Sequence, residues 1–195
     1  MYVRQVHQST LRADRLRASE QICAGCVELG SFAWPATRLA ELGSVSLRTF
    51  HRYFATRAEV VAPLFLDASD TVNAYVANAR ADSTRDLLTG AHESMFGGAR
   101  AGFTSRLFPL VLADPQLTGV FLRALHDGEA ALHPVLASRA GLSDTAPSAR
   151  ALSSAFTAAN RIALERMSSE SAPRLDVFTE MMSAFAPLLP SLPAG

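Results

Sequence analysis

The sequence lacks lysine altogether and contains only two cysteines and one tryptophan. All 18 basic residues are therefore arginines, which we interpret as a compositional bias of the genome rather than a functional feature. No apolar run approaches the roughly 18 residues of a membrane-spanning helix. Residues 1–12 also lack the apolar stretch of a secretion signal. These absences predict a cytoplasmic protein that does not associate with membranes.

The motifs of common enzyme classes are missing as well. The chain has no His-Glu-x-x-His element, no glycine-rich loop for phosphates and no serine nucleophile elbow. We therefore expect a protein that is not an enzyme and that carries no cofactor and no metal ion. One pattern supports a metal-responsive alternative, because His126, Glu129 and His133 would share one helix face at spacings i, i+3 and i+7. Solvated side chains on a polar face explain the same pattern.

The two cysteines, Cys23 and Cys26, form a single Cys-x-x-Cys pair. No second pair follows, and no strand precedes them as in thioredoxin-like motifs. The simpler interpretation is that two small side chains pack one face of a helix, since the cytosol keeps thiols reduced. A thiol switch that uses Cys23 and Cys26 is the alternative.

What the chain does have is apolar content and an uneven distribution of charge. Hydrophobic residues make up 49% of the sequence, enough for a substantial core in one or two domains. Residues 1–60 hold eight arginines and five acidic residues, so this part carries a formal charge of +3 and the remainder −3. A basic amino-terminal module on an acidic body is typical of proteins that bind nucleic acid with one end.

Long segments of the chain have helical apolar spacing, and the sustained alternation of strands is absent. The sequence therefore predicts an all-α fold, and no internal repeat is visible. The expected helices cover about residues 13–29, 35–42, 57–80, 84–103, 107–112 and 115–139, with a short helix from Leu47 and two more helices near the carboxy terminus. In the first helix, the residues expected to face inward are Leu16, Ile22, Cys26 and Leu29.

Residues 43–57 have the pattern of a short helix with one apolar and one polar face. Ser46 can cap the amino terminus of this helix with its hydroxyl group, after a Gly-Ser turn. At about 100° per residue, Phe50 and Phe54 share one face and would anchor the helix. Arginine, threonine, histidine and tyrosine side chains elsewhere on the helix supply donors for phosphates and base edges. An ordinary amphipathic surface helix is the alternative.

The preceding short helix, which Pro35 begins and Gly43 stops, gives the spacing of a helix-turn-helix. In this context the segment resembles the tetracycline-repressor (TetR) family of transcriptional regulators. The resemblance rests on Gly30, Leu39-Ala40, Val45-Ser46, the run Thr49-Phe50-His51-Arg52-Tyr53-Phe54, and Arg57. The sequence departs from the family pattern at Pro35, Ser44, His51 and Arg57, where threonine, glycine, tyrosine and lysine are common. We interpret Gly43 as the usual glycine displaced by one place.

The resemblance implies a role for each matching residue. In the family, the first turn of the third helix reads bases, while its middle and the start of the next helix hold phosphates. Leu47, Arg48 and His51 would accordingly face base edges. Thr49, Arg52, Tyr53 and Arg57 would hold the DNA backbone, Thr37 would reach DNA from the preceding helix, and Ser46 would cap the reading helix.

The resemblance also implies a helical body that binds a small effector. Apolar walls and a few polar side chains would suit an apolar or amphipathic molecule. The candidate ligand-binding residues are His92, Met95, Phe96, Phe103, Phe108, Phe121, Leu125, His126, Phe156 and Asn160. Phenylalanines at helical spacing are equally typical of an ordinary core, which is the alternative.

The last two helices each carry an apolar seam. The candidate dimerisation residues are Leu152, Phe156, Ala159, Ala163, Met167, Phe178, Met182 and Phe185. The resemblance implies a two-fold four-helix interface, which would place two reading helices about 34–36 Å apart on successive major grooves. Packing of both seams within one subunit is the alternative.

Together these patterns predict a DNA-binding domain at residues 1–57 and a ligand-binding and dimerisation domain at residues 58–195. The expected function is that of a homodimeric repressor, which binds a palindromic double-stranded operator and leaves it when an effector binds. One alternative is a DNA-binding regulator that senses redox state through Cys23 and Cys26. The other is a regulator that responds to a metal ion.

Overall fold

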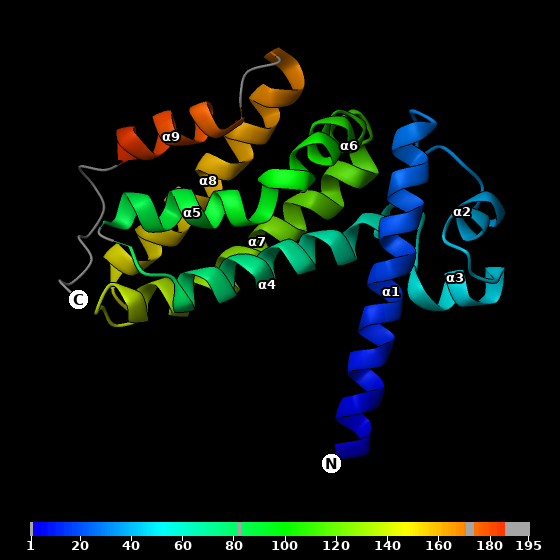
Figure 1. Cartoon of the computed structure of the whole chain (residues 1–195), viewed down its shortest axis with the longest axis horizontal. Coiled ribbons are helices and arrows are strands. Elements are labelled where there is room, and N and C mark those ends of the chain that lie inside the picture. The colour runs from blue at the N-terminus through cyan, green and yellow to red at the C-terminus, as the bar shows by residue number, and fades with distance from the viewer. Residues whose placement is uncertain (1, 82, 171–173, 186–195) are drawn as a thin grey trace. The chain divides into compact units, whose positions relative to one another are not determined.

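The computed structural model describes residues 2–81, 83–170 and 174–185. Within these residues the regular secondary structure is entirely helical, so the expected all-α fold is confirmed (Figure 1). The α-helices are α1 (Tyr2–Glu28), α2 (Ala36–Leu42), α3 (Leu47–Tyr53), α4 (Ala62–Asn78), α5 (Thr84–Phe96), α6 (Ala101–Ala113), α7 (Pro115–Arg139), α8 (Pro147–Glu170) and α9 (Arg174–Phe185). Two short 3₁₀ helices, η1 (Ala58–Val61) and η2 (Gly98–Arg100), precede α4 and α6.

Several helix boundaries in the first half of the chain differ from the sequence prediction. Helix α1 begins at Tyr2 rather than near residue 13, because the segment before residue 13 contains neither glycine nor proline to interrupt a helix. Pro35 is the N-cap of α2 and not its first residue. The segment expected as one helix from residue 57 begins with η1, and Pro63 lies in the first turn of α4, where its missing N–H costs little.

The helix expected over residues 84–103 is also shorter than predicted. Helix α5 ends at Phe96, because Gly97 and Gly98 follow and Gly98 has a φ of +58°. Helix α6 then runs from Ala101 to Ala113, which joins two segments that the sequence pattern had separated.

The chain divides into two compact units. Unit 1 comprises Met1–Asp67 and Leu110–Leu122, and unit 2 comprises Ala68–Pro109 and Arg123–Gly195. Unit 1 therefore contains α1, α2, α3 and η1 together with the turn between α6 and α7. Unit 2 contains α5, α8, α9 and the longer part of α7. A functional boundary at residue 57 stays a prediction.

In unit 1, one face of α1 packs against the short helices that follow it. Figure 1 shows α2 and α3 beside the carboxy-terminal half of α1, while its amino-terminal half extends past them. The inward residues of α1 that are 2% exposed or less are Ala18, Ser19, Ile22, Cys23 and Cys26. Leu29, which the sequence pattern placed inward, is instead 44% exposed because α1 ends one residue earlier.

Helices α1 and α2 approach each other closely at Gly25. A Cβ atom at this position would lie 2.6 Å from Cδ2 of Leu42, closer than real side chains come. The glycine in α1 thus makes room for the last residue of α2. A larger residue at position 25 would therefore displace the end of the Leu42 side chain, and glycine avoids that displacement.

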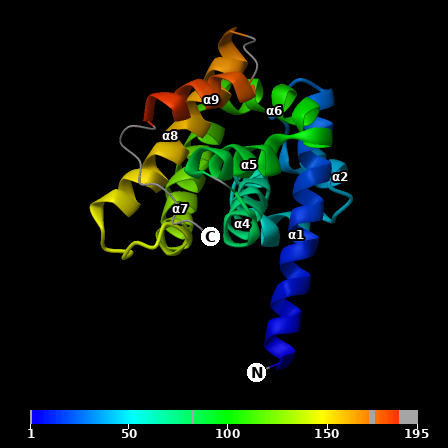
Figure 2. The same ribbon diagram turned by 60° about the vertical axis from the view of Figure 1, so that its left-hand side comes forward.

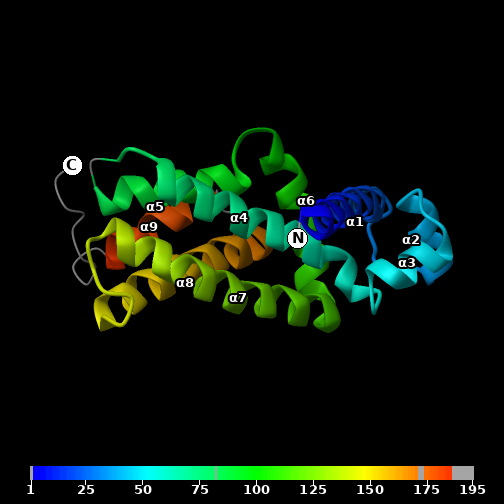
Figure 3. The same cartoon turned by 90° about the horizontal axis from the view of Figure 1, so that it is seen from below.

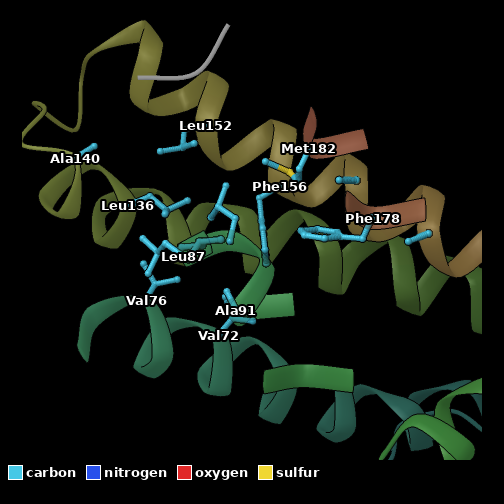
Figure 4. Close-up of a cluster of buried hydrophobic side chains, with 14 of the residues drawn as sticks. Val72, Val76, Leu87, Ala91, Leu136, Ala140, Leu152, Phe156, Phe178 and Met182 are labelled. Atoms are coloured by element: carbon cyan, nitrogen blue, oxygen red, sulfur yellow. The ribbon is translucent and has the colours of Figure 1, made fainter. Parts of the chain in front are cut away.

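Unit 2 has one continuous hydrophobic core, to which α4, α5, α7, α8 and α9 contribute (Figure 4). Figures 2 and 3 show α8 beside α7, and Figure 2 shows α9 beside α8. The largest core residues are Val72, Val76, Leu87, Leu88, Leu132, Leu136, Leu152, Phe156, Val177, Phe178 and Met182. Burial of each such side chain contributes about 1.5–3 kcal/mol, so this core is the main source of stability in unit 2.

Candidate nucleic-acid interface

The turn between α2 and α3 sets the direction of the reading helix. Backbone N–H groups of Ser44 and Val45 donate to the carbonyl oxygens of Glu41 and Ala40, each at 3.0 Å. Ser44 has a φ of +52°, in the left-handed region that residues other than glycine seldom adopt. The left-handed conformation therefore lies at Ser44, and the interpretation that Gly43 replaces the usual glycine of this turn is wrong.

Gly43 has a different role in the same turn. Its own φ is −81°, which any residue can adopt. A Cβ atom there would lie 2.9 Å from Cγ1 of Ile22 and 3.4 Å from the carbonyl oxygen of Ala18. Gly43 is thus needed for the close approach of the turn to α1, not for its backbone angle.

The amino terminus of α3 is capped as the sequence predicts. Oγ of Ser46 accepts a hydrogen bond from the backbone N–H of Thr49 at 3.1 Å. The Ser46 hydroxyl also donates to Oγ1 of Thr49 at 2.9 Å. The cap fixes the first turn of α3, which is the turn that the resemblance assigns to base reading.

Helix α3 has two distinct faces. Phe50 and Phe54 are 1% and 0% exposed, and their ring centroids lie 5.3 Å apart, so both act as the expected anchors. The exposed residues of α3 are Leu47, Arg48, His51 and Arg52, and Thr37 is exposed on α2. Leu47 is 41% exposed although its spacing places it near the apolar face. The charged and polar side chains of α3 therefore face solvent over a fixed hydrophobic base.

Two predicted DNA-backbone contacts, Thr49 and Tyr53, also have contacts within unit 1. Thr49 is half-buried, and its hydroxyl group is bonded to Ser46. Tyr53 is 9% exposed, with its ring edge-on to Phe54 at 6.1 Å. The guanidinium of Arg52 lies 5.1 Å from the centre of the Tyr53 ring, so Tyr53 supports an exposed arginine.

Arg57, another predicted phosphate contact, is also bonded inside unit 1. Its Nη2 lies 2.8 Å from Oδ2 of Asp114 and 3.3 Å from Oε1 of Gln116. Its Nη1 donates to the carbonyl oxygen of Phe32 at 3.2 Å. The Arg57 side chain is 30% exposed and that of Asp114 is 24% exposed. No local spacing pattern in the sequence predicts these partners, because they lie 25 to 59 positions away from Arg57.

The cysteines of α1 are both fully buried. Burial raises the pKa of the Cys23 thiol, and the neighbouring Cys26 raises it further. Burial raises the pKa of Cys26 to about 12, against a smaller opposing effect of Arg57. A buried, protonated thiol is a poor nucleophile, so the structure favours the packing role over a redox switch.

Unit 2 contains a buried polar cluster around His92. Nδ1 of His92 lies 2.6 Å from Oδ1 of Asn160, whose Nδ2 donates to the carbonyl oxygen of Phe156 at 2.9 Å. Nη1 of Arg174 contacts Nε2 of His92. Because arginine only donates, Nε2 accepts and Nδ1 carries the proton. Burial, reinforced by the charge of Arg174 and opposed by the bond to Asn160, lowers the pKa of His92 to about 3.

Arg174 is the charged member of this cluster. Its side chain is 9% exposed, and Nη2 donates to the carbonyl oxygen of Phe96 at 3.1 Å. Its carboxylate partner, Glu93, is 40% exposed and lies 3.4 Å away. Burial lowers the pKa of Arg174, and Glu93 opposes that effect. Sequence reasoning missed this residue, because an arginine in the first turn of a terminal helix has the pattern of a surface residue.

Comparison with solved structures identifies the fold that these helices form. A TetR-family transcriptional regulator from Streptomyces coelicolor matches 92% of this chain and 80% of its own, with a TM-score of 0.59 and 13% identity. A protein from Rhodococcus sp. that is assigned to the same family matches 92% of this chain and 98% of its own, with a TM-score of 0.54 and 16% identity. The chain has the TetR fold. No family model and no curated protein matches the sequence.

Within the TetR fold, the predicted ligand-binding residues are divided between the two units. His92 and Asn160 form the polar cluster, and the rings of Phe96 and Phe108 are edge-on at 6.3 Å. Met95, Phe96, Phe103 and Leu125 are half-buried, whereas Phe108, Phe121 and Phe156 are buried. Phe121 belongs to unit 1, where its ring packs against Phe65 at 5.4 Å. His126 is exposed on α7, unlike the buried His92, and its role in ligand binding stays a prediction.

The predicted dimerisation residues lie mainly inside one copy of unit 2. Leu152, Phe156, Ala159, Ala163, Phe178 and Met182 are buried, and Met167 and Phe185 are half-buried. Figure 4 shows four of them, Leu152, Phe156, Phe178 and Met182, within the core. The buried members of these seams therefore pack within one copy of unit 2, and a dimer interface that includes Met167 and Phe185 stays a prediction.

The metal-like pattern on α7 does not form a site. Nε2 of His133 is bonded to the carbonyl oxygen of Asp144 at 2.5 Å, and Glu129 accepts from Ser154 at 2.7 Å. Among the residues that the structure describes, no group of three or more His, Cys, Asp or Glu side chains is placed to hold a metal ion. Over the same residues, none of the helices is both long and apolar enough to cross a membrane.

Proposed function

We propose that the protein is a DNA-binding transcriptional regulator that reads its operator with α3. The observation that carries this proposal is the division of α3 into a buried face, Phe50 and Phe54, and an exposed face with Arg48 and His51. The TetR fold and the net charge of +3 on residues 1–60 support the same function. The protein acts through binding and is not an enzyme in this proposal.

The exposed side chains of α3 divide into two roles. Arg48 and His51 donate to base edges, and the exposed Leu47 contacts the methyl group of thymine. Arg52 and Thr37 hold phosphates, which fix the register but carry no sequence information. Three further predicted residues act indirectly: Ser46 and Thr49 order the first turn of α3, and Tyr53 supports Arg52.

The regulator functions as a homodimeric repressor on a palindromic operator. One α3 covers a single half-site, whereas two-fold pairing places two copies about 34–36 Å apart, one turn of DNA. Because the predicted seams are buried in one subunit, the interface in this proposal uses the outward faces of α8 and α9, where Ala158 is half-buried and Ala184 exposed. Sedimentation equilibrium is expected to give twice the chain mass of 20.9 kDa. A monomer that binds the full palindrome would contradict this part.

An effector releases the operator by preferring a conformation of low DNA affinity. The polar cluster of His92, Asn160 and Arg174 in unit 2 is suited to orient such a molecule, with the ring of Phe96 beside the guanidinium. Arg174 is nearly buried while its partner Glu93 is 40% exposed and 3.4 Å away, so the anionic group of an effector could replace Glu93 as the partner of this guanidinium. The proposed effector is therefore an amphipathic acid.

Matched acids and amides test this effector class. A panel of aromatic and aliphatic carboxylates is compared with the corresponding amides for thermal stabilisation and for release of operator DNA. The acids are expected to act more strongly on the wild type, and Arg174→Gln to remove the difference. Arg161→Gln is the control, because it breaks a partly exposed pair with Glu165 of 2.8 Å in the same unit. Equal effects of every acid and its amide would contradict an anionic effector.

Selection from a random double-stranded DNA pool tests the proposed function itself. Purified protein at near-physiological salt is expected to enrich a palindrome, with half-sites about 10 base pairs apart from centre to centre. Arg48→Ala, which removes an exposed side chain and leaves the anchors Phe50 and Phe54 in place, should enrich a less defined sequence. No enrichment by the wild type over a range of salt concentrations would refute DNA recognition by α3.

A further inference from the structure

Arg57 is the one predicted phosphate contact with an ionic partner inside unit 1. Its Nη2 donates to Asp114 and Gln116, and its Nη1 donates to the carbonyl oxygen of Phe32. With the side chain 30% exposed, solvent reaches the guanidinium, but these acceptors already engage both terminal nitrogens. The three bonds use three of the five N–H donors of the guanidinium, and Asp114 pairs its charge, so a phosphate oxygen has to compete with a carboxylate for Arg57.

Asp114 is held in place to act as such an acceptor. Its Oδ1 accepts hydrogen bonds from the backbone N–H groups of Gln116 at 2.8 Å and Leu117 at 3.5 Å, which caps the amino terminus of α7. Its Oδ2 is left for Arg57 at 2.8 Å. The hydroxyl group of Thr118 donates to the carbonyl oxygen of Val111 at 2.9 Å and ties the two sides of the turn together.

A second arginine pair in unit 1 shows how unusual this arrangement is. Arg38 and Glu41 form an ion pair of 2.9 Å on α2, but their side chains are 46% and 66% exposed. Exposed pairs of this kind contribute little, since both side chains lose rotamer freedom in water. The Arg57–Asp114 pair is less exposed, and its carboxylate is already fixed by the cap.

We propose that Asp114 competes with DNA phosphate for Arg57, so that the turn between α6 and α7 is an autoinhibitory contact on the DNA-binding surface. This inference rests on the DNA-binding function proposed above. In the free protein, Asp114 neutralises a cation that the operator would otherwise attract. On binding, a phosphate takes over the guanidinium, and the broken pair reduces the net gain in affinity.

Asp114→Asn tests the competition without removing the cap. The asparagine side chain keeps an acceptor for the N–H groups of α7 but loses the charge that holds Arg57. Glu41→Gln is the matched control, since it removes one negative charge and one arginine pair from the same unit. Asp114→Asn is expected to lower the Kd for the selected operator about fivefold. Glu41→Gln should change the Kd far less, and in an Arg57→Gln background the gain from Asp114→Asn should disappear.

If the Arg57–Asp114 ion pair is purely structural, Asp114→Asn should raise the Kd for the operator instead of lowering it. In that case Asp114→Asn and Arg57→Gln both weaken DNA binding, and the inference is overturned. It is equally overturned if Asp114→Asn and Glu41→Gln have the same effect on the Kd. Gln116→Ala is a second variant that leaves the Asp114 side chain untouched, and it should give a smaller gain that also depends on Arg57. A wild type that selects no operator refutes the proposed function, whereas an operator bound equally by both charge variants refutes this inference alone.

Discussion

Helix α3 in unit 1 and the His92 cluster in unit 2 use the same residue types in opposite environments. On α3, Arg48 and His51 are exposed beside a buried aromatic base. In unit 2, His92 is fully buried and its Nε2 accepts from Arg174, which is 9% exposed on its side chain. The first arrangement offers donors to a partner outside the chain, and the second satisfies its donors internally.

The arginines of the two regions differ in how much water they have lost on folding. An exposed arginine exchanges water and counterions for phosphate, so its binding depends strongly on salt. A buried arginine has already lost its hydration and depends on the bonds around it. The exposed donors of α3 are therefore the ones that the proposed function uses for DNA, whereas the bonds of the His92 cluster join segments of unit 2 to one another.

The largest effect should come from removing an anchor of α3. Phe50 is 1% exposed, and Phe50→Ala is expected to cost about 3–5 kcal/mol of unfolding free energy, because the cavity lies at the centre of unit 1. Leu47→Ala on the exposed face should change stability by about 0.5 kcal/mol or less. Urea denaturation measures both variants. Similar losses would mean that the two faces of α3 do not differ as the structure indicates.

A second effect, which is spread over several pH units, is expected from protonation of His92. The pKa of His92 is about 3 in the folded protein against an ordinary value of 6.5, so between these values the unfolded chain binds a proton that the folded chain excludes. Stability should fall as pH decreases from 6.5 towards 3, with a slope of up to about 1.4 kcal/mol per pH unit from this group. A protonated ring also loses the acceptor that Nε2 offers to Arg174.

Denaturation midpoints across this pH range isolate the contribution of His92. His92→Gln should flatten the pH dependence more than His126→Gln, which changes an exposed histidine of the same unit. The carboxylates that titrate in the same range are common to all three proteins. Identical profiles for the two variants would show that His92 is not kept neutral by its surroundings.

The smallest effects concern the turn before α3. Ser44→Gly should raise stability by about 1 kcal/mol, because glycine adopts the φ of +52° without strain. Gly43→Ala should lower it by about 1–3 kcal/mol, since the added methyl group would meet Ile22 at 2.9 Å. Thermal unfolding of the two single variants checks the signs. If Ser44→Gly destabilises the protein, the positive φ of Ser44 is not a source of strain.

The sequence predicts the features of α3 that depend on local spacing. The cap at Ser46 and the anchors Phe50 and Phe54 follow from the order of residues along one helix, and the structure confirms them. The partners of Arg57 and the place of Arg174 depend on contacts between segments distant in sequence. No periodicity within a single helix contains that information.

The apolar seams of α8 and α9 also show that spacing within one helix does not predict which segment the helix contacts. Helical spacing identifies the apolar face of each helix correctly, but it does not say which surface will cover that face. In the structure, Phe156 of α8 and Phe178 of α9 lie against each other, with ring centroids 5.8 Å apart. A seam that could have joined two subunits is therefore used within one.

The most direct test of the account measures how single-base changes in the selected operator affect binding by the wild type and by Arg48→Ala. If α3 reads bases through Arg48, the variant should lose about 1–3 kcal/mol of discrimination at one base pair in each half-site and keep the wild-type preference elsewhere. A uniform loss of affinity at every position would contradict base reading by this residue. Unchanged discrimination at all positions would contradict the assignment of α3 as the reading helix.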